Sequence, residues 1–146
     1  MNEKMIQLDN IVVRFGTFEA LHNINVTVGE GEFFTFLGPS GCGKTTTLRT
    51  ITGFIDPVSG SIRVKGQDIT HVPIEERNIG IVFQSYALFP TMTVYDNIAF
   101  GLKIKKLKKA ELDKRVREIA RKVDLSDEQL GKAVSQLSGG QQQRVA

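Results

Sequence analysis

One stretch of the chain has the residue types and spacing of a phosphate-binding loop. Its eight residues match the pattern G-x-x-x-x-G-K-[ST] at every defined position: Gly38, Pro39, Ser40, Gly41, Cys42, Gly43, Lys44 and Thr45. Because glycine has no Cβ, the backbone can turn tightly and bring its N–H groups close to a polyphosphate. We expect Lys44 to reach the β- and γ-phosphate oxygens and the Thr45 hydroxyl to bind the bridging Mg²⁺, with Thr46 as a further candidate donor.

The segments on either side predict the strand and the helix that such a loop requires. Residues 33–37 are apolar on both alternations, as in a buried parallel strand, and residues 46–51 can continue as a helix until Gly53. The N-terminus of that helix would add partial positive charge behind the phosphates. Cys42 occupies a position that the motif leaves free, which favours a tolerated small side chain over a nucleophile.

Composition limits the class of protein. A chain of 146 residues, 40% hydrophobic and 24% charged, is typical of one soluble globular domain, and no apolar run approaches the roughly 18 residues of a membrane span. One cysteine and a start without an apolar signal region predict a reducing cytoplasm. The net charge of +3 is concentrated in the later third and does not by itself indicate a nucleic-acid partner.

Strand patterns flank the loop on both sides. Residues 5–13 predict a strand with a polar turn or bulge at residues 9–10, and residues 26–28 predict its short antiparallel partner. Residues 61–65 alternate as a strand with one solvated face, and residues 79–83 predict another buried strand. We therefore expect an antiparallel margin beside a parallel core.

Helical patterns dominate the later part. Thr93 and Asp96 form a capping-box pattern ahead of one helix, and a second helix is predicted from an apolar stripe at Leu112, Val116, Ile119 and Val123. The connection between the two helices carries lysines at 103, 105, 106, 108 and 109. The pattern favours a solvated linker over contact with anionic lipid headgroups.

Three other positions have a functional and an ordinary interpretation. Phe15 can offer a flat face to a purine base, although the pattern favours a core residue. Gln84 follows residues 79–83 at the carboxyl end of a predicted strand, where its oxygen can touch a metal or its water, although a polar strand terminus is the simpler interpretation. Ser138 and Gln141 predict a capped helix N-terminus that is either a second anion site or a plain cap.

Taken in order, these motifs resemble the nucleotide-binding domain of ATP-binding cassette (ABC) proteins. Residues 38–45 correspond to the Walker A loop, Gln84 to the Q-loop, and the signature motif is Leu137, Ser138, Gly139, Gly140 and Gln141. The resemblance implies an α/β fold, a P-loop NTPase sandwich with an antiparallel β margin and an α-helical subdomain. We place the ATP-binding α/β core at residues 1–86 and the helical subdomain at residues 87–146.

The resemblance also implies roles for individual residues, with ATP and Mg²⁺ as cofactors. Phe15 would stack on adenine, and Gln84 together with Thr45 would contact Mg²⁺. In a homodimer, the signature motif would cover the ATP held by the Walker A loop of the opposite protomer. These roles come from the family and not from the spacing alone.

Residues 72–80 and 87–98 resemble importer ATPases for sugars, polyamines, iron, sulfate or phosphonates. This implies transmembrane permease subunits bound through the helical subdomain, a peripheral position on the cytoplasmic face of the membrane, and no nucleic-acid partner. The alternative is a soluble ABC ATPase of DNA repair or translation, against which the importer-like region argues.

The sequence ends inside the signature helix, at residues 144–146. The Walker B aspartate, the catalytic glutamate and the switch histidine of the family have no counterpart before that point. We therefore expect a fragment, incomplete at the C-terminus and with no catalytic residue of its own. Since phosphoryl transfer depends on positioning water and neutralising charge, hydrolysis by this chain alone should be negligible.

Overall fold

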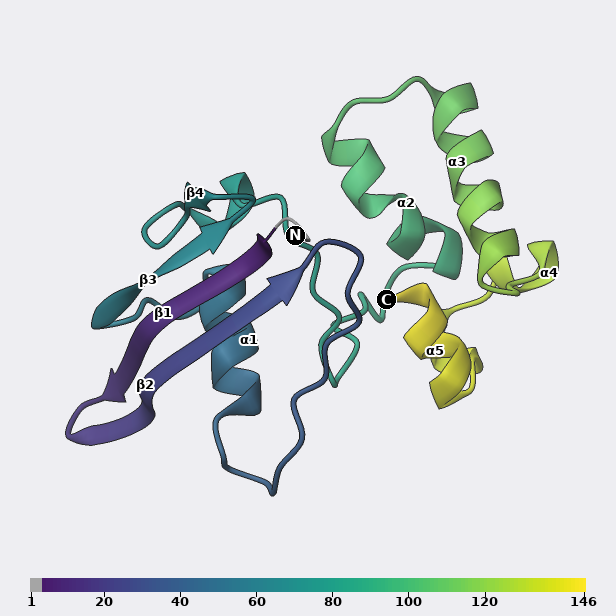
Figure 1. Ribbon diagram of the computed structural model, residues 1–146. Helices are drawn as coiled ribbons and strands as arrows, with labels where there is room; N and C mark the ends of the chain where they lie inside the picture. Colours follow the sequence, from purple (N-terminus) through teal and green to yellow (C-terminus); the bar gives the residue numbers. More distant parts are fainter. Residues whose placement is uncertain (1–3) are drawn as a thin grey trace. The chain divides into compact units, whose positions relative to one another are not determined.

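The computed structural model describes residues 4–146 (Figure 1). Their contacts divide the chain into two compact units, residues 1–81 and residues 82–146, and each is described by itself. Within residues 4–146, no helix is both long enough and apolar enough to cross a membrane.

The first unit is built on a four-stranded antiparallel sheet in the order β2-β1-β3-β4. Its strands are β1 (Lys4–Phe15), β2 (Phe18–Gly29), β3 (Ser59–Val64) and β4 (Gln67–Asp68). The ladder between β1 and β2 shifts register between Leu8 and Ile11, where Asn10 has a φ of 52°. The predicted strand, its bulge and its antiparallel partner are confirmed, although the partner is longer than the pattern indicated.

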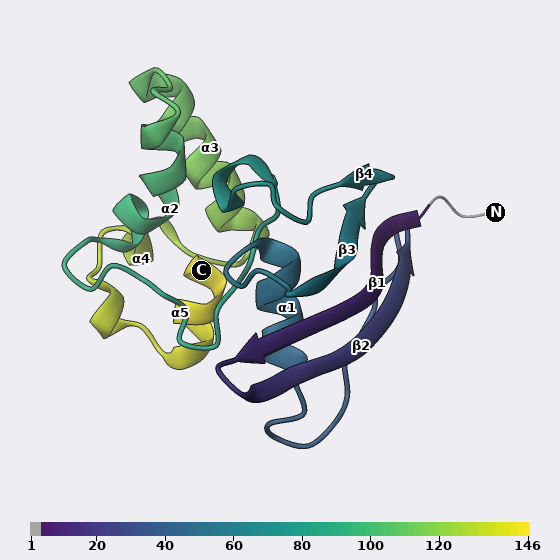
Figure 2. The same ribbon diagram turned by 90° about the vertical axis from the view of Figure 1, so that its left-hand side faces the viewer.

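One helix, α1 (Lys44–Thr52), packs against the sheet of the first unit (Figures 1 and 2). It ends as predicted at Gly53, whose φ of 91° is left-handed and whose N–H donates to the carbonyls of Arg49 and Thr50. Ile51 joins a buried cluster with residues of the sheet and the turn after it, namely Leu8, Ile11, Val13, Leu21, Ile62 and Ile69. This cluster fixes the helix that follows the glycine loop.

The prediction of a buried parallel strand at residues 33–37 and of another buried strand at residues 79–83 is wrong. Neither segment forms a strand among residues 4–146, and Phe33 and Leu37 are 93% and 88% exposed. A strand forms only where a neighbouring strand provides hydrogen bonds to its backbone N–H and carbonyl groups. The sheet of the first unit consists of antiparallel pairs that include neither segment. An apolar run indicates that a segment can be buried, but it does not indicate whether a neighbouring strand is present to pair with it.

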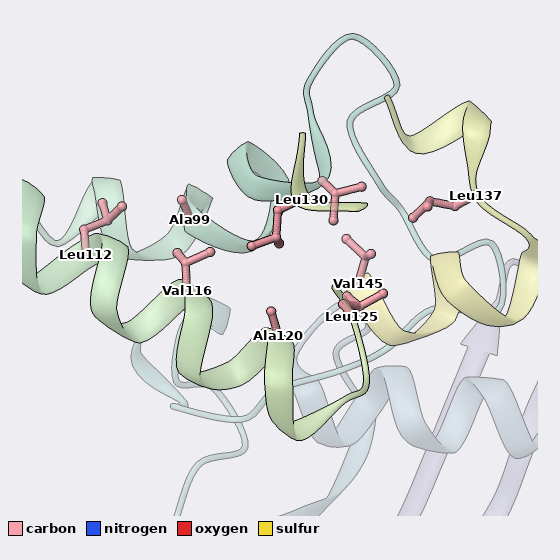
Figure 3. Close-up of a cluster of buried hydrophobic side chains, with 9 residues drawn as sticks. Ala99, Leu112, Val116, Ala120, Leu125, Leu130, Leu137 and Val145 are labelled. Carbon is pink, nitrogen blue, oxygen red and sulfur yellow. The ribbon is translucent and has the colours of Figure 1, made fainter. Parts of the chain in front are cut away.

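The second unit is helical, with α2 (Val94–Ile104), α3 (Lys109–Lys122), α4 (Asp127–Leu130) and α5 (Gly139–Val145). Figure 3 shows side chains from these helices and their connections pointing toward one another in a single cluster; its members are Val94, Ala99, Leu112, Val116, Ala120, Leu125, Leu130, Leu137 and Val145. The predicted start of α2 is confirmed, because the Thr93 hydroxyl accepts the N–H of Asp96 at 3.1 Å.

The apolar stripe of α3 is partly as predicted. Leu112 and Val116 are buried, but Ile119 is 44% exposed and Ala120 takes its place in the core. With 3.6 residues per turn, Ala120 lies about 40° around the helix from Val116, whereas Ile119 lies about 60° away on the other side. A stripe centred on Val116 therefore includes Ala120 and leaves Ile119 at its margin.

Leu130 gives a test of the helical core. It is 3% exposed, so Leu130→Ala leaves a cavity and is expected to lower the free energy of unfolding by about 2–5 kcal/mol. The matched control is Ile104→Ala at a position 68% exposed, where we expect a change below about 0.5 kcal/mol. Urea unfolding followed by circular dichroism measures both; equal losses would contradict the described core.

Candidate functional site

The glycines of the 38–45 loop adopt backbone conformations that other residues rarely take. Gly38 has a φ of 154° and Gly43 a φ of 90°. A Cβ at Gly43 would lie 2.6 Å from Leu21 Cδ2, and one at Gly38 would lie 2.8 Å from Cys42 Sγ. Side chains at either position would therefore strain the turn and clash with Leu21 or Cys42. The glycine requirement read from the sequence is confirmed in the turn itself.

Lys44 is folded over this turn. Its ammonium donates to the carbonyl oxygens of Gly38 at 2.7 Å and Pro39 at 2.6 Å, and it lies 3.3 Å from Cys42 Sγ. These acceptors are neutral, whereas a phosphate oxygen is charged and makes a stronger bond to an ammonium. The lysine is thus positioned at the loop with partners that an anion can replace.

The start of α1 adds donors to the same place. Gly43 is the N-cap residue of α1, and no side chain of residues 4–146 accepts a hydrogen bond from the N–H groups at the start of this helix. No acidic residue lies in the first turn, and the first N–H groups of a helix have no partner within it. Thr45 is exposed, while Thr47, two residues further along the helix, is buried with its hydroxyl donating to the Gly43 carbonyl at 2.9 Å. Together these features suit a polyphosphate with a hard cation: the glycine turn, the Lys44 ammonium, the uncapped N-terminus of α1 and the exposed Thr45 hydroxyl.

Beside the loop lies a cavity of about 630 Å³. Its charged and hydroxyl-bearing residues are Glu32, Thr35, Lys44 and Thr45, and the remaining lining is apolar, with Phe33, Phe34, Phe36, Val26, Val28 and Leu48 among its members. An apolar surface of this kind does not bind phosphate. The cavity lies along the unpaired 33–37 segment, and the candidate phosphate cradle is the turn at residues 38–45.

Phe15 is not a core residue. It ends β1 and is 52% exposed, opposite Phe18 in the ladder, which is 66% exposed. Nearby, Glu19 accepts from Arg14 at 2.8 Å and contacts His22 at 2.6 Å. The hydrogen bond from Arg14 holds the pKa of the Glu19 carboxyl below its usual value. The face of Phe15 is open, and its stacking on adenine stays a prediction.

Gln84 and the signature motif belong to the second unit. Gln84 is exposed and precedes two residues with positive φ, Tyr86 and Ala87. Ser138 caps α5 as predicted: its Oγ accepts the N–H of Gln141 at 3.3 Å, and its own N–H donates to Gln141 Oε1 at 2.9 Å. The interpretation of Ser138 as a helix cap is confirmed, whereas its role as an anion site and the metal contact of Gln84 stay predictions.

Within the signature motif the residues face different surroundings. Leu137 is 7% exposed and belongs to the core in Figure 3, and its carbonyl accepts from Gln142 Nε2 at 3.1 Å. Gly139 and Gly140 are exposed, and a Cβ at either would meet open space. Leu137 therefore anchors the motif, and the exposed backbone that follows it is the part available to a ligand.

Arg77 is a structural residue that the sequence patterns missed. It is 6% exposed, and its guanidinium donates to four carbonyls, those of Thr50, Ile51, Thr70 and Val72, at 2.7–3.0 Å. Burial lowers the pKa of this guanidinium, an effect that the charge of Asp56 opposes. Two of the four acceptors lie in the last turn of α1, so Arg77 stabilises the end of the helix whose start forms the loop. No local pattern signals it, because its partners are up to 27 residues away.

With this geometry in place, comparison with known proteins identifies the chain's relatives. The family model described as "ABC transporter" matches residues 21–146, and the chain belongs to this family. The chain is 51% identical over 146 residues to the spermidine/putrescine import ATP-binding protein PotA of Pseudomonas aeruginosa, covering 100% of the chain and 40% of that relative. It is 50% identical over 145 residues to PotA of Pasteurella multocida, covering 99% and 39%.

Solved structures show the same fold. The dimeric structure of MJ0796, a bacterial ABC transporter cassette, matches with a TM-score of 0.85 and 33% identity, covering 97% of this chain and 66% of that one. Its post-hydrolysis state bound to ADP and Pi matches with a TM-score of 0.85 and 32% identity. The predicted fold class is thus confirmed, and so is the resemblance to importer-type ATP-binding subunits. The chain spans about 40% of the length of the curated relatives it matches.

Proposed function

We propose that the protein is the ATP-binding subunit of an ABC importer and that residues 38–45 hold the phosphates of ATP. The observation that carries this proposal is the glycine turn with the Lys44 ammonium bonded to its carbonyls at 2.6–2.7 Å. Family membership supports ATP as the nucleotide, and the importer relatives support transport over the soluble alternative. Bound ATP supplies the free energy that drives transport.

Each residue of the loop has a task in this proposal. The N–H groups from Gly41 to Thr46 bind phosphate oxygens, and Lys44 leaves the Gly38 and Pro39 carbonyls for the β- and γ-phosphates. The Thr45 hydroxyl binds Mg²⁺, with Gln84 as a further ligand to the metal or its water. Among residues 4–146 no group of three His, Cys, Asp or Glu side chains could hold a metal ion. The phosphates themselves are therefore expected to be the main ligands of Mg²⁺.

Hydrolysis is assigned to a homodimer of the full-length protein and not to residues 1–146 alone. In that dimer the exposed backbone at Ser138, Gly139 and Gly140 would face the ATP of the partner subunit. The dimeric cassette structures among the relatives support this arrangement.

Comparing substitutions at two serines can distinguish the loss of a helix cap from the loss of a nucleotide contact. Ser138 and Ser126 both close reciprocal capping boxes, at α5 and α4. Ser138→Ala and Ser126→Ala are each expected to lower the free energy of unfolding by about 1 kcal/mol. Only Ser138→Ala is expected to lower ATP hydrolysis by the dimer, by about tenfold or more, because only that side chain would donate to a phosphate. Equal hydrolysis rates for the two variants would refute the signature role.

The solute is proposed from the relatives, since no residue of the nucleotide site contacts it. PotA relatives are named as importers of spermidine and putrescine, so polyamines are the first solutes to test. We place the subunit at the cytoplasmic face of the membrane, bound to transmembrane permease subunits through the helical unit. Uptake of labelled polyamines in cells lacking and then regaining the gene tests the proposal; co-purification with ribosomes or DNA and never with permeases would favour the soluble alternative.

A further inference from the structure

Positive charge is concentrated where α2 joins α3. Residues 103–109, the basic connection, contain five lysines and no acidic residue. Residues 94–122 contain ten basic and four acidic side chains, while the whole chain has a net charge of only +3, so the rest of the chain is net negative. Both views show the basic connection, in green, at the end of the α2 and α3 pair away from α5 (Figures 1 and 2).

Nearby acidic groups do not neutralise this charge. Asp96 contacts Lys103 at 2.7 Å, Glu111 contacts Arg115 at 2.6 Å, and Asp113 contacts Arg117 at 3.0 Å. In the described part of the chain no ion pair involves Lys105, Lys106, Lys108 or Lys109. Four ammonium groups thus remain available to an external anion.

Helix stability does not explain two of these lysines. Lys108 is the N-cap of α3, without a side-chain capping bond, and Lys109 is its first residue. The N-terminus of a helix carries partial positive charge, so cations there are unfavourable, whereas Lys103 near the C-terminus of α2 is favourable. The helix dipole therefore does not stabilise Lys108 and Lys109, and among residues 4–146 their ammonium groups have no ion pair to hold them.

Two apolar residues lie among the lysines. Leu107 is half-buried and packs against the helical core, which fixes the connection to its unit. Ile104 is 68% exposed. An exposed aliphatic side chain beside several lysines suits the interface of an anionic bilayer, which offers both headgroup charge and an apolar layer. The backbone of a nucleic acid offers no such layer for Ile104.

We propose that the basic connection binds the anionic phospholipid surface of a membrane, with the four unpaired lysines at the headgroups and Ile104 in the interface. This contact goes beyond the proposed function because it requires neither nucleotide nor a permease. This proposal departs from the sequence-based preference for a solvated linker.

The test is co-sedimentation of the purified protein with vesicles of phosphatidylcholine, with and without phosphatidylglycerol. We expect binding only to vesicles with phosphatidylglycerol, weakening as salt rises. Since each lysine near such a surface contributes about fivefold in affinity, changing Lys105, Lys106, Lys108 and Lys109 together to Gln should lower the partition coefficient by about 100-fold or more. Ile104→Gln should lower it by about threefold to tenfold without changing its salt dependence.

A control with the same loss of charge changes four basic residues outside the basic connection to Gln: Lys65, Arg121, Lys122 and Lys132. We expect the control to bind within about threefold of the unchanged protein, because none of the four changed groups belongs to the basic connection. Arg121 and Lys122 lie about 18–20 Å along α3 from Lys109, beyond a Debye length of about 10 Å. Both variants should keep the circular dichroism spectrum and MgATP affinity, which separates this inference from the nucleotide site. Equal vesicle binding by the two quadruple variants, equal binding to vesicles without phosphatidylglycerol, or retention by nucleic acid but not by vesicles would overturn it.

Discussion

Lys44→Ala is expected to lower ATP-driven uptake by at least about 100-fold, because the proposed function assigns its ammonium to neutralising charge on the transferred phosphate. Affinity for MgATP should fall by about 10–100-fold, since the bonds lost are charge-assisted. Isothermal titration measures the affinity, and solute accumulation in cells measures the uptake.

The fold should survive this substitution. The present partners of the ammonium are exposed loop carbonyls, so the free energy of unfolding should change by less than about 1 kcal/mol. Lys122→Ala, at an exposed position at the end of α3, provides the matched control and should leave affinity and uptake unchanged. Normal uptake by a folded Lys44→Ala protein would remove the basis for the proposed function.

Arg77→Met has the largest expected effect on stability. It leaves four carbonyls without their donors, inside a region from which water is largely excluded, and should lower the free energy of unfolding by about 3–5 kcal/mol. Urea unfolding measures the loss. Arg77→Lys should be intermediate, because a compact ammonium cannot reach four acceptors spread over two segments.

The control for charge is Arg63→Met. Arg63 contacts Asp9 at 3.2 Å with a side chain 43% exposed, so removing this solvent-screened pair should cost less than about 1 kcal/mol. Equal losses of stability for the two arginine substitutions would contradict the stabilising role assigned to the four buried hydrogen bonds of Arg77. Gly53 belongs to the same arrangement, since a Cβ there would lie 2.7 Å from Arg77 Nε.

Local chemistry made several turns and helix ends predictable, including the glycine turn of the candidate site. The glycine turn, the stop at Gly53 and the caps at Thr93 and Ser138 depend on residues within a few positions of one another, so the sequence displays them directly. The bulge in β1 was also visible as a polar pair in an apolar strand.

Features that depend on distant partners were not predictable from such patterns. Residues 33–37 are apolar enough for a buried strand, but strand formation requires a neighbour elsewhere in the chain. Arg77 appears in the sequence as one more charged residue, and only folding brings it to the end of α1. Phe15 is a large apolar residue, so hydrophobicity alone assigns it to the core. In the structure it ends a strand at a hairpin and is exposed.

Backbone amide shifts on adding a non-hydrolysable ATP analogue with Mg²⁺ test the central claim most directly. If the turn at residues 38–45 holds the phosphates, saturating ligand should shift the N–H resonances of Gly41, Gly43, Lys44 and Thr45 most strongly and move the Lys44 side-chain signal as its ammonium leaves the Gly38 and Pro39 carbonyls. Saturation with these resonances unmoved, and the largest shifts elsewhere, would contradict the account.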